Sequence, residues 1–131
     1  MEKESIEEKN KAVIHRWVDE MYADARWELM PELAGPLYTR HESTGTYTVT
    51  IEDHMKKLQN LYGGIEEAQS RDGSYQLFAE GDKVCMIGTF KGYRKGGETD
   101  FDIYNFVQVF RLENGKIVET WFPGFVKNVE W

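Results

Sequence analysis

His41 is the residue of this sequence best suited to transfer a proton, because an imidazole with an ordinary pKa of about 6.5 can act as acid or base at neutral pH. The alternative interpretation is a structural histidine that closes the end of a strand through a backbone hydrogen bond. His54 is a second candidate that could face His41, although its place beside Leu58 on a predicted helix also fits a surface position. His15 lies beside Arg16 on the polar side of another predicted helix and is expected to have no role in chemistry.

A strand predicted over residues 99–112 carries the second group of candidates. Side chains on a strand alternate between its two faces, so an inward Gln108 implies the same orientation for its alternate neighbours. These neighbours are Asp102, Tyr104, Phe106 and Phe110, and the last predicted strand would add Thr120 and Phe122. Aromatic walls with a few polar points are typical of small-molecule sites, so the pattern predicts a pocket.

The polar residues of this group suggest what such a pocket could do. A carboxylate among aromatic rings has its pKa raised by desolvation, which suits an acid–base role, but Asp102 could equally stay hydrated at the pocket mouth. Tyr104 and Gln108 could donate hydrogen bonds to a carbonyl or a developing enolate oxygen. The Trp17 indole could do the same, with plain core packing as its alternative. Asp100 and Asp102 lack a third ligand at metal-binding spacing, so no metal and no cofactor are predicted.

The overall composition is that of an acidic globular protein of domain size. The chain has 131 residues, 14% of them aromatic, and a formal net charge of −7. Negative charge repels phosphate backbones, so nucleic acid is not an expected partner. Cys85 is the single cysteine, and no stretch is apolar enough for a signal peptide or a membrane span. We therefore expect one cytoplasmic domain over residues 1–131, with no membrane partner.

The first half of the chain has the period of amphipathic helices. Apolar residues share one face of a helix predicted over 6–23, namely Val13, Ile14, Trp17, Val18 and Met21. A short second helix is predicted over 26–34. Thr50 fits the cap of a third helix that ends at Gly63-Gly64. Met55 lies on the apolar stripe of this third helix and is an expected substrate contact.

The second half of the chain alternates with the period of strands. Strands are predicted over 37–44, 47–49, 74–80, 83–92, 99–112 and 116–124. Turns are predicted at Gly81, at 94–97 and at Asn114-Gly115, the last being a strong hairpin signal. Helices followed by a run of strands are typical of an α+β fold. Long strands twist and coil, so we expect a strongly curved, mostly antiparallel sheet whose trough the helices cover, with a pocket between the layers.

Three segments resemble a known family: Asn10 to Trp17, Pro31 to His41, and Val109 to Trp121. Together they resemble the SnoaL-like polyketide cyclases, which belong to the cone-fold superfamily of nuclear transport factor 2, ketosteroid isomerase and scytalone dehydratase. The resemblance spans about residues 8–124 and is more specific for fold than for activity. It implies a cone-shaped α+β barrel with three N-terminal helices, a pocket at the wide end, and often a homodimer through the outer sheet face.

The resemblance also suggests pocket positions residue by residue. His41 stands where the superfamily often has a pocket His or Asp, and Gln108 where related enzymes have a substrate-orienting group. Trp17 resembles a pocket Tyr of ketosteroid isomerases, and Tyr38 is a further expected contact. The cyclases typically have His-Trp-Asp near the end of the last strand and Gly-Thr-His on the preceding hairpin; here these runs are Thr120-Trp121-Phe122 and Gly88-Thr89-Phe90.

We interpret the pocket as that of a cofactor-free enzyme of isomerase, cyclase or dehydratase type, acting on a small apolar or aromatic carbonyl compound. His41 would transfer the proton, aided by Asp102 or His54. One alternative is a non-catalytic binding module for an apolar ligand, since Thr120 and Phe122 remove charge from the pocket and add ring surface. Another is a dimerising interaction domain whose contact surface contains Trp121, Phe125, Val129 and Trp131.

Overall fold

The computed structural model of the protein describes residues 4–62, 73–93 and 101–131, and its first element is helix α1 (Ile6–Arg16). Ser5 caps this helix, because its hydroxyl accepts a hydrogen bond from the Glu8 backbone N–H at 3.1 Å. The chain continues directly into the π-helix η1 (Trp17–Tyr22), so the two elements together confirm the helix predicted over 6–23. Single π-helical turns are frequent at functional sites.

The remaining helices are short and cover the same side of the molecule. The 3₁₀-helix η2 (Trp27–Leu29) leads into α2 (Met30–Leu33), which confirms a helical segment near 26–34. Helix α3 (Ile51–Tyr62) begins as predicted, with the Thr50 hydroxyl accepting from the Asp53 N–H at 3.1 Å. Its predicted end at Gly63-Gly64 lies outside the described residues. None of the helices in the described parts of the chain is long and apolar enough to cross a membrane.

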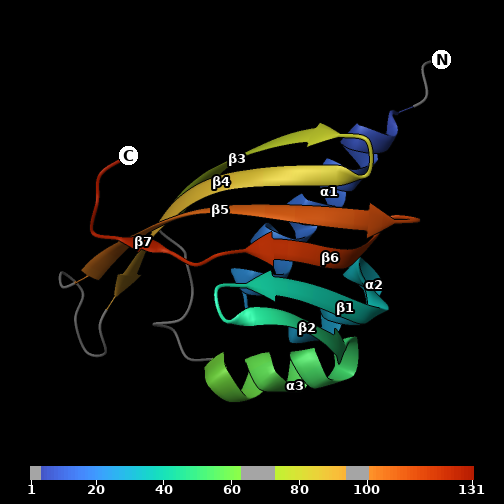
Figure 1. The fold of residues 1–131 in the computed structure, drawn as a ribbon, viewed down its shortest axis with the longest axis horizontal. Helices are drawn as coiled ribbons and strands as arrows, with labels where there is room; N and C mark the ends of the chain where they lie inside the picture. Colours follow the sequence, from blue (N-terminus) through green and yellow to red (C-terminus); the bar gives the residue numbers. More distant parts are fainter. Residues whose placement is uncertain (1–3, 63–72, 94–100) are drawn as a thin grey trace.

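The strands form one mixed sheet in the order β2-β1-β6-β5-β4-β3, with β7 paired to β5 (Figure 1). Their bounds are β1 (Ala34–Glu42), β2 (Gly45–Thr50), β3 (Gly73–Glu80), β4 (Lys83–Tyr93), β5 (Phe101–Glu113), β6 (Lys116–Phe122) and β7 (Val126–Lys127). Asn114 and Gly115, with φ of 50° and 76°, make the predicted tight turn between β5 and β6. The turn predicted at 94–97 lies outside the described residues.

Two pairings differ from a simple run of hairpins. Strand β1 pairs in parallel with β6, where Arg40 lies opposite Thr120 and Glu42 opposite Phe122. The short strand β7 adds to β5 beyond the end of β6. The first pairing joins segments far apart in the sequence, and the second adds a segment too short to show a period. Local patterns therefore reveal neither of them.

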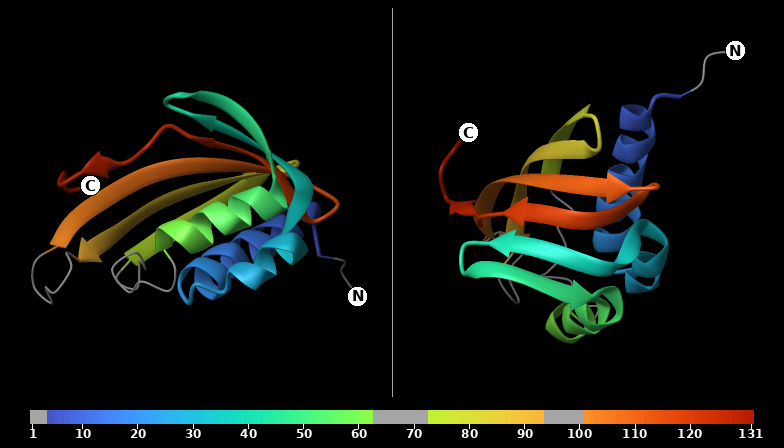
Figure 2. Two further views of the ribbon diagram at one scale, coloured as in Figure 1. Left: turned by 90° about the horizontal axis from the view of Figure 1, so that it is seen from below. Right: turned by 45° about the vertical axis from the view of Figure 1, so that its right-hand side comes forward.

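The sheet arches over the helices, which all lie against its concave face (Figure 2). Ile14 and Met21 from the first helix pack there with Phe110 from β5, and all three side chains are fully buried. The α+β architecture and the curved, mostly antiparallel sheet are therefore confirmed. Among the described strands β2 and β3 end the order, so the sheet is an open cone and does not close into the predicted barrel.

Candidate functional site

A cavity of about 280 Å³ lies between the helices and the concave face of the sheet. Most of its lining is apolar: the aromatic residues Trp17, Tyr22, Tyr38, Phe90, Phe106, Phe122 and Phe125, with Val18, Leu58 and Met86. The polar lining residues are Arg40, Glu42, His54, Lys57, Gln108 and Thr120. Helix η1 contributes Trp17, Val18 and Tyr22, so the π-helical turn forms part of the cavity wall.

The aromatic wall is a cluster of edge-to-face rings. Phe125 packs against Phe122 at 4.9 Å and against Phe106 at 5.8 Å between ring centroids, and Phe90 joins from β4. Phe106 lies directly on Gly88 of the neighbouring strand, where a β-carbon would come within 2.6 Å of the ring. A side chain at residue 88 would therefore push the Phe106 ring into the cavity.

The polar end of the cavity is built by β1 and α3. Tyr38 is buried against the helices, so strand alternation also turns Arg40 and Glu42 toward the cavity. These two form an ion pair. Helix α3 presents His54 and Lys57 one turn apart on the same side. Two cations, a carboxylate and an imidazole thus meet at one end of an otherwise aromatic cavity.

His54 is neutral in this setting. Its side chain is buried, and burial together with the positive charges of Arg40 and Lys57 lowers its pKa from 6.5 to about 4. The Arg40 guanidinium can only donate, so the 3.4 Å contact between its Nη1 and His54 Nδ1 makes Nδ1 the acceptor. The proton of the ring then sits on Nε2, which makes His54 a hydrogen-bond donor.

Thr120 organises the neutral polar groups of the cavity. Its hydroxyl donates to the Val109 carbonyl at 2.9 Å and accepts from Gln108 Nε2 at 2.9 Å. The buried Tyr38 lies beside these groups in the cavity wall. Burial raises the pKa of Tyr38 well above its usual value, so this phenol stays protonated.

Most of the pocket residues predicted from the sequence meet at this cavity: Trp17, Tyr38, His54, Phe106, Gln108, Thr120 and Phe122. Two predicted contacts do not line the cavity. Tyr104 stacks on Phe90 at 5.1 Å, so it contacts a ring of the aromatic wall without lining the cavity. Met55 is partly buried and packs against the core.

The predicted position of His41 in the pocket is wrong. Because Tyr38 and Arg40 face inward, His41 falls on the outer face of β1. There its ring stacks on Trp121 at 5.1 Å, and its Nε2 donates to the Glu119 carboxylate at 2.6 Å. Hydrogen bonds from His41 and from Arg111 lower the pKa of Glu119. His41 therefore belongs to a polar network on the convex side of the sheet.

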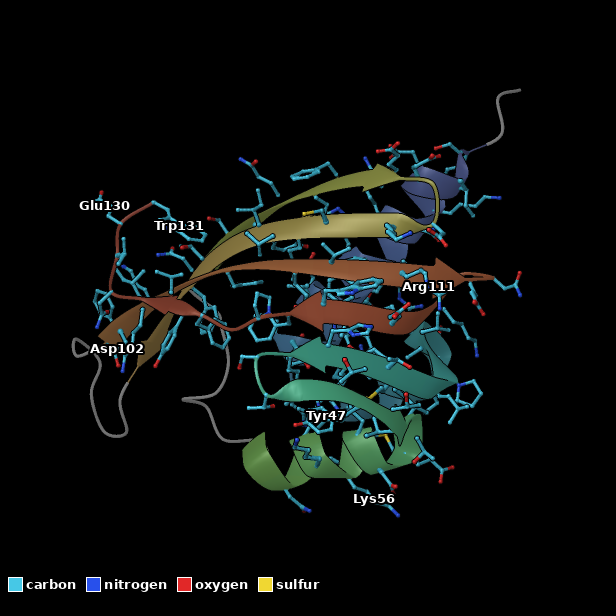
Figure 3. The ribbon with its side chains drawn as sticks, viewed as in Figure 1. Tyr47, Lys56, Asp102, Arg111, Glu130 and Trp131 are labelled. Carbon is cyan, nitrogen blue, oxygen red and sulfur yellow. The ribbon has the colours of Figure 1, made fainter. Side chains whose placement is uncertain are left out.

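Asp102 does face the concave side but lies outside the cavity, at the opposite end of β5 from Arg111 (Figure 3). It is buried, accepts from Asn128 Nδ2 at 3.0 Å and pairs with Lys127 Nζ at 3.4 Å. These contacts hold the C-terminal segment that carries Phe125 to the cavity wall. Alternation predicts the face on which Asp102 lies, but not how far along β5 it lies from the polar end of the cavity.

Sequence reasoning missed Arg40, Glu42 and Lys57 and the three rings Tyr22, Phe90 and Phe125. The signal for the first two was present, because residues two and four positions after Tyr38 must share its face. Phe125 follows the last predicted strand and carries no periodic signal of its own.

A neighbouring cavity of about 360 Å³ shares Val18, Met86, Phe90 and Phe106 with the first. Two of its polar lining residues contact each other: the Tyr75 hydroxyl donates to Asp19 at 2.9 Å, and it also lies 2.7 Å from His15 Nδ1. The described residues contain no group of three His, Cys, Asp or Glu side chains that could hold a metal ion in either cavity.

Comparisons with known proteins agree with this fold. A SnoaL-like polyketide cyclase candidate from Jannaschia sp. CCS1 has a TM-score of 0.73 at 18% identity, covering 98% of this chain and 91% of the other. A candidate polyketide cyclase from Acidithiobacillus ferrooxidans gives 0.72 at 16%, covering 95% and 92%. An LEH-like epoxide hydrolase of M. tuberculosis gives 0.69 at 10%, covering 93% and 82%.

At these identities the likeness to the solved structures shows a shared fold, and it does not show a shared activity. No curated protein matches the chain. A family profile described as the SnoaL-like domain matches residues 14–120, which is most of the sequence. The chain therefore belongs to the SnoaL-like domain family.

Proposed function

We propose that the protein is a cofactor-free enzyme that moves a proton next to the carbonyl group of a small apolar or aromatic compound. The observation that carries this proposal is the meeting of Arg40, Glu42 and His54 at one end of an aromatic cavity of about 280 Å³. Enclosed aromatic walls with a few converging polar groups are the usual setting for such chemistry.

Glu42 is the base in this proposal. It carries the one carboxylate among the lining residues that the structure describes, whereas His54 has its Nδ1 lone pair directed at Arg40. The Glu42 carboxylate would take a proton from the carbon beside the carbonyl, and the C–H electron pair would form the enolate. The His54 Nε2–H and the positive charge of Arg40 would stabilise the enolate oxygen, and protonated Glu42 would return the proton to carbon.

Binding without turnover is the second candidate function. Thr120 and Phe122 favour it, because an uncharged hydroxyl and an aromatic ring stand at cavity positions where proton-transfer groups could have been. In that case the cavity would hold an apolar ligand, and Glu42 would serve only to neutralise Arg40.

Hydrogen–deuterium exchange of 2-tetralone tests the two candidates. This bicyclic ketone has acidic protons beside its carbonyl, and NMR in D₂O follows their loss. We expect the protein to accelerate exchange above the buffer rate, and 2-naphthol, which resembles the enol, to inhibit it. Saturable binding of 2-naphthol with exchange at the buffer rate would support the binding module and contradict the enzyme.

The outer face of the sheet supports a further proposal, a homodimer. A row of paired residues crosses this face from β3 to β6, namely Phe78, Cys85, Val109 and Trp121, with the exposed Ile87 and Val107 beside it. Apolar side chains on neighbouring strands make a continuous surface that a second copy could cover.

We expect Ile87→Asp to give monomers in light scattering at concentrations where the wild type is dimeric. A charge placed within an apolar interface loses its hydration without gaining a partner. Gln59→Asp, at an exposed position of helix α3 on the opposite side of the sheet, is the control and should leave the dimer intact. A wild type that stays monomeric at high concentration would contradict the dimer.

The absence of a cofactor and the cytoplasmic location stay predictions from the sequence.

A further inference from the structure

The polar end of the cavity carries an excess of positive charge. Arg40 and Glu42 form an ion pair and balance each other. Lys57 is the remaining charged residue of the lining, and no described carboxylate forms an ion pair with it. The whole chain, in contrast, has a net charge of −7, so the sign of the charge at this site is opposite to that of the protein.

The other titratable groups at this end do not supply a compensating negative charge. His54 is neutral and directs a hydrogen-bond donor, its Nε2–H, away from Arg40. Tyr38 keeps its proton, because burial raises its pKa. The site therefore offers a cation and N–H donors that match a ligand oxygen with negative charge.

The rest of the cavity limits the size and character of the ligand. Trp17, Tyr22, Phe106, Phe122 and Phe125 enclose it with rings, and its volume of about 280 Å³ is near the lower end of ligand pockets. Such walls favour a compact aromatic or alicyclic body, and the charged end lies at one side of it.

We propose that the natural ligand is a compound of one or two rings that carries a single negative charge, such as a carboxylate, held near Lys57 and the Arg40–Glu42 pair. This inference rests on the proposed function, because it names the substrate class of the same cavity. It adds that the substrate is already an anion before any proton moves.

A matched pair of probes tests the charge. 2-Naphthoate and 2-naphthamide have the same ring system and nearly the same shape, but only the first is charged at pH 7. We expect calorimetry to show that the wild type binds 2-naphthoate about tenfold more tightly than 2-naphthamide at low salt, and that added salt reduces the difference.

Two lysine variants locate the effect. Lys57→Met should remove most of the preference for 2-naphthoate and change 2-naphthamide affinity little. Lys56→Met is the matched control, since Lys56 lies next in sequence on the side of α3 that faces away from the strands (Figure 3). It should keep the preference.

The outcomes separate the two proposals. Equal affinity for the two probes, or equal effects of the two lysine variants, would overturn the anionic ligand and leave the cavity as a binding site. Failure of both probes to bind would overturn this inference and the proposed function together.

Discussion

Glu42→Gln should reduce the exchange of 2-tetralone by about 10²–10⁴-fold, the usual contribution of a positioned general base. Gln has the shape of Glu but cannot accept a proton at neutral pH, so the loss would come from chemistry and not from packing. The ion pair with Arg40 also disappears, which leaves the guanidinium free for the substrate oxygen. Binding of 2-naphthol should therefore persist in this variant while exchange is lost.

Glu119→Gln is the matched control for this prediction. Glu119 lies on β6 close to β1, but on the outer face of the sheet, where it binds His41 and Arg111. Its substitution makes the same change of side chain as Glu42→Gln, at a residue that does not line the cavity. Equal exchange rates for the wild type and Glu42→Gln would contradict the assignment of Glu42 as the base. Equal losses in both variants would point to a structural effect.

The second large effect expected is a dependence of stability on pH that comes from His54. The pKa of His54 is about 4 in the folded protein, against about 6.5 when the chain is unfolded. Between these values the unfolded chain binds a proton that the folded protein does not, so the free energy of unfolding rises with pH. We expect the free energy of unfolding to show its full value above pH 6.5. It should fall by about 3 kcal/mol as the pH drops to 4.

Urea unfolding at a series of pH values measures this effect. His54→Gln should lose the part of the pH dependence between pH 4 and 6.5, because Gln does not titrate. His15→Gln has the same change of side chain at a half-exposed position and should follow the wild type. If the two variants show the same pH dependence, His54 is not the buried neutral histidine described above.

The candidate site shows where local patterns suffice. Alternation along β5 correctly puts Phe106 and Gln108 in the cavity wall, because a long regular strand keeps its period. The same rule applied from Tyr38 gives Arg40 and Glu42. His41 attracts attention by its chemistry, yet it stands at the odd position of the alternation and faces outward.

Asp102 shows where the rule stops. Alternation gives its face correctly, but not its distance from the other polar groups. In a curved sheet the two ends of a 13-residue strand lie far apart, and Asp102 meets the C-terminal segment instead. Which residues on one face of a strand share a site is a question of tertiary distance.

By itself the sequence determined the helices and the strands β1 to β6 of this protein, the tight turn at Asn114-Gly115 and the curved α+β architecture, and three of its segments resemble the family. The elements, the turn and the architecture follow from the period of apolar residues and from turn chemistry, which act over a few neighbouring residues. Only the tertiary structure decided which residues form the polar end of the cavity. The parallel pairing of β1 with β6 and the packing of α3 bring Arg40, Glu42, His54 and Lys57 together, and the C-terminal segment closes the wall with Phe125. Those contacts join segments distant along the chain, so their geometry depends on how the layers pack.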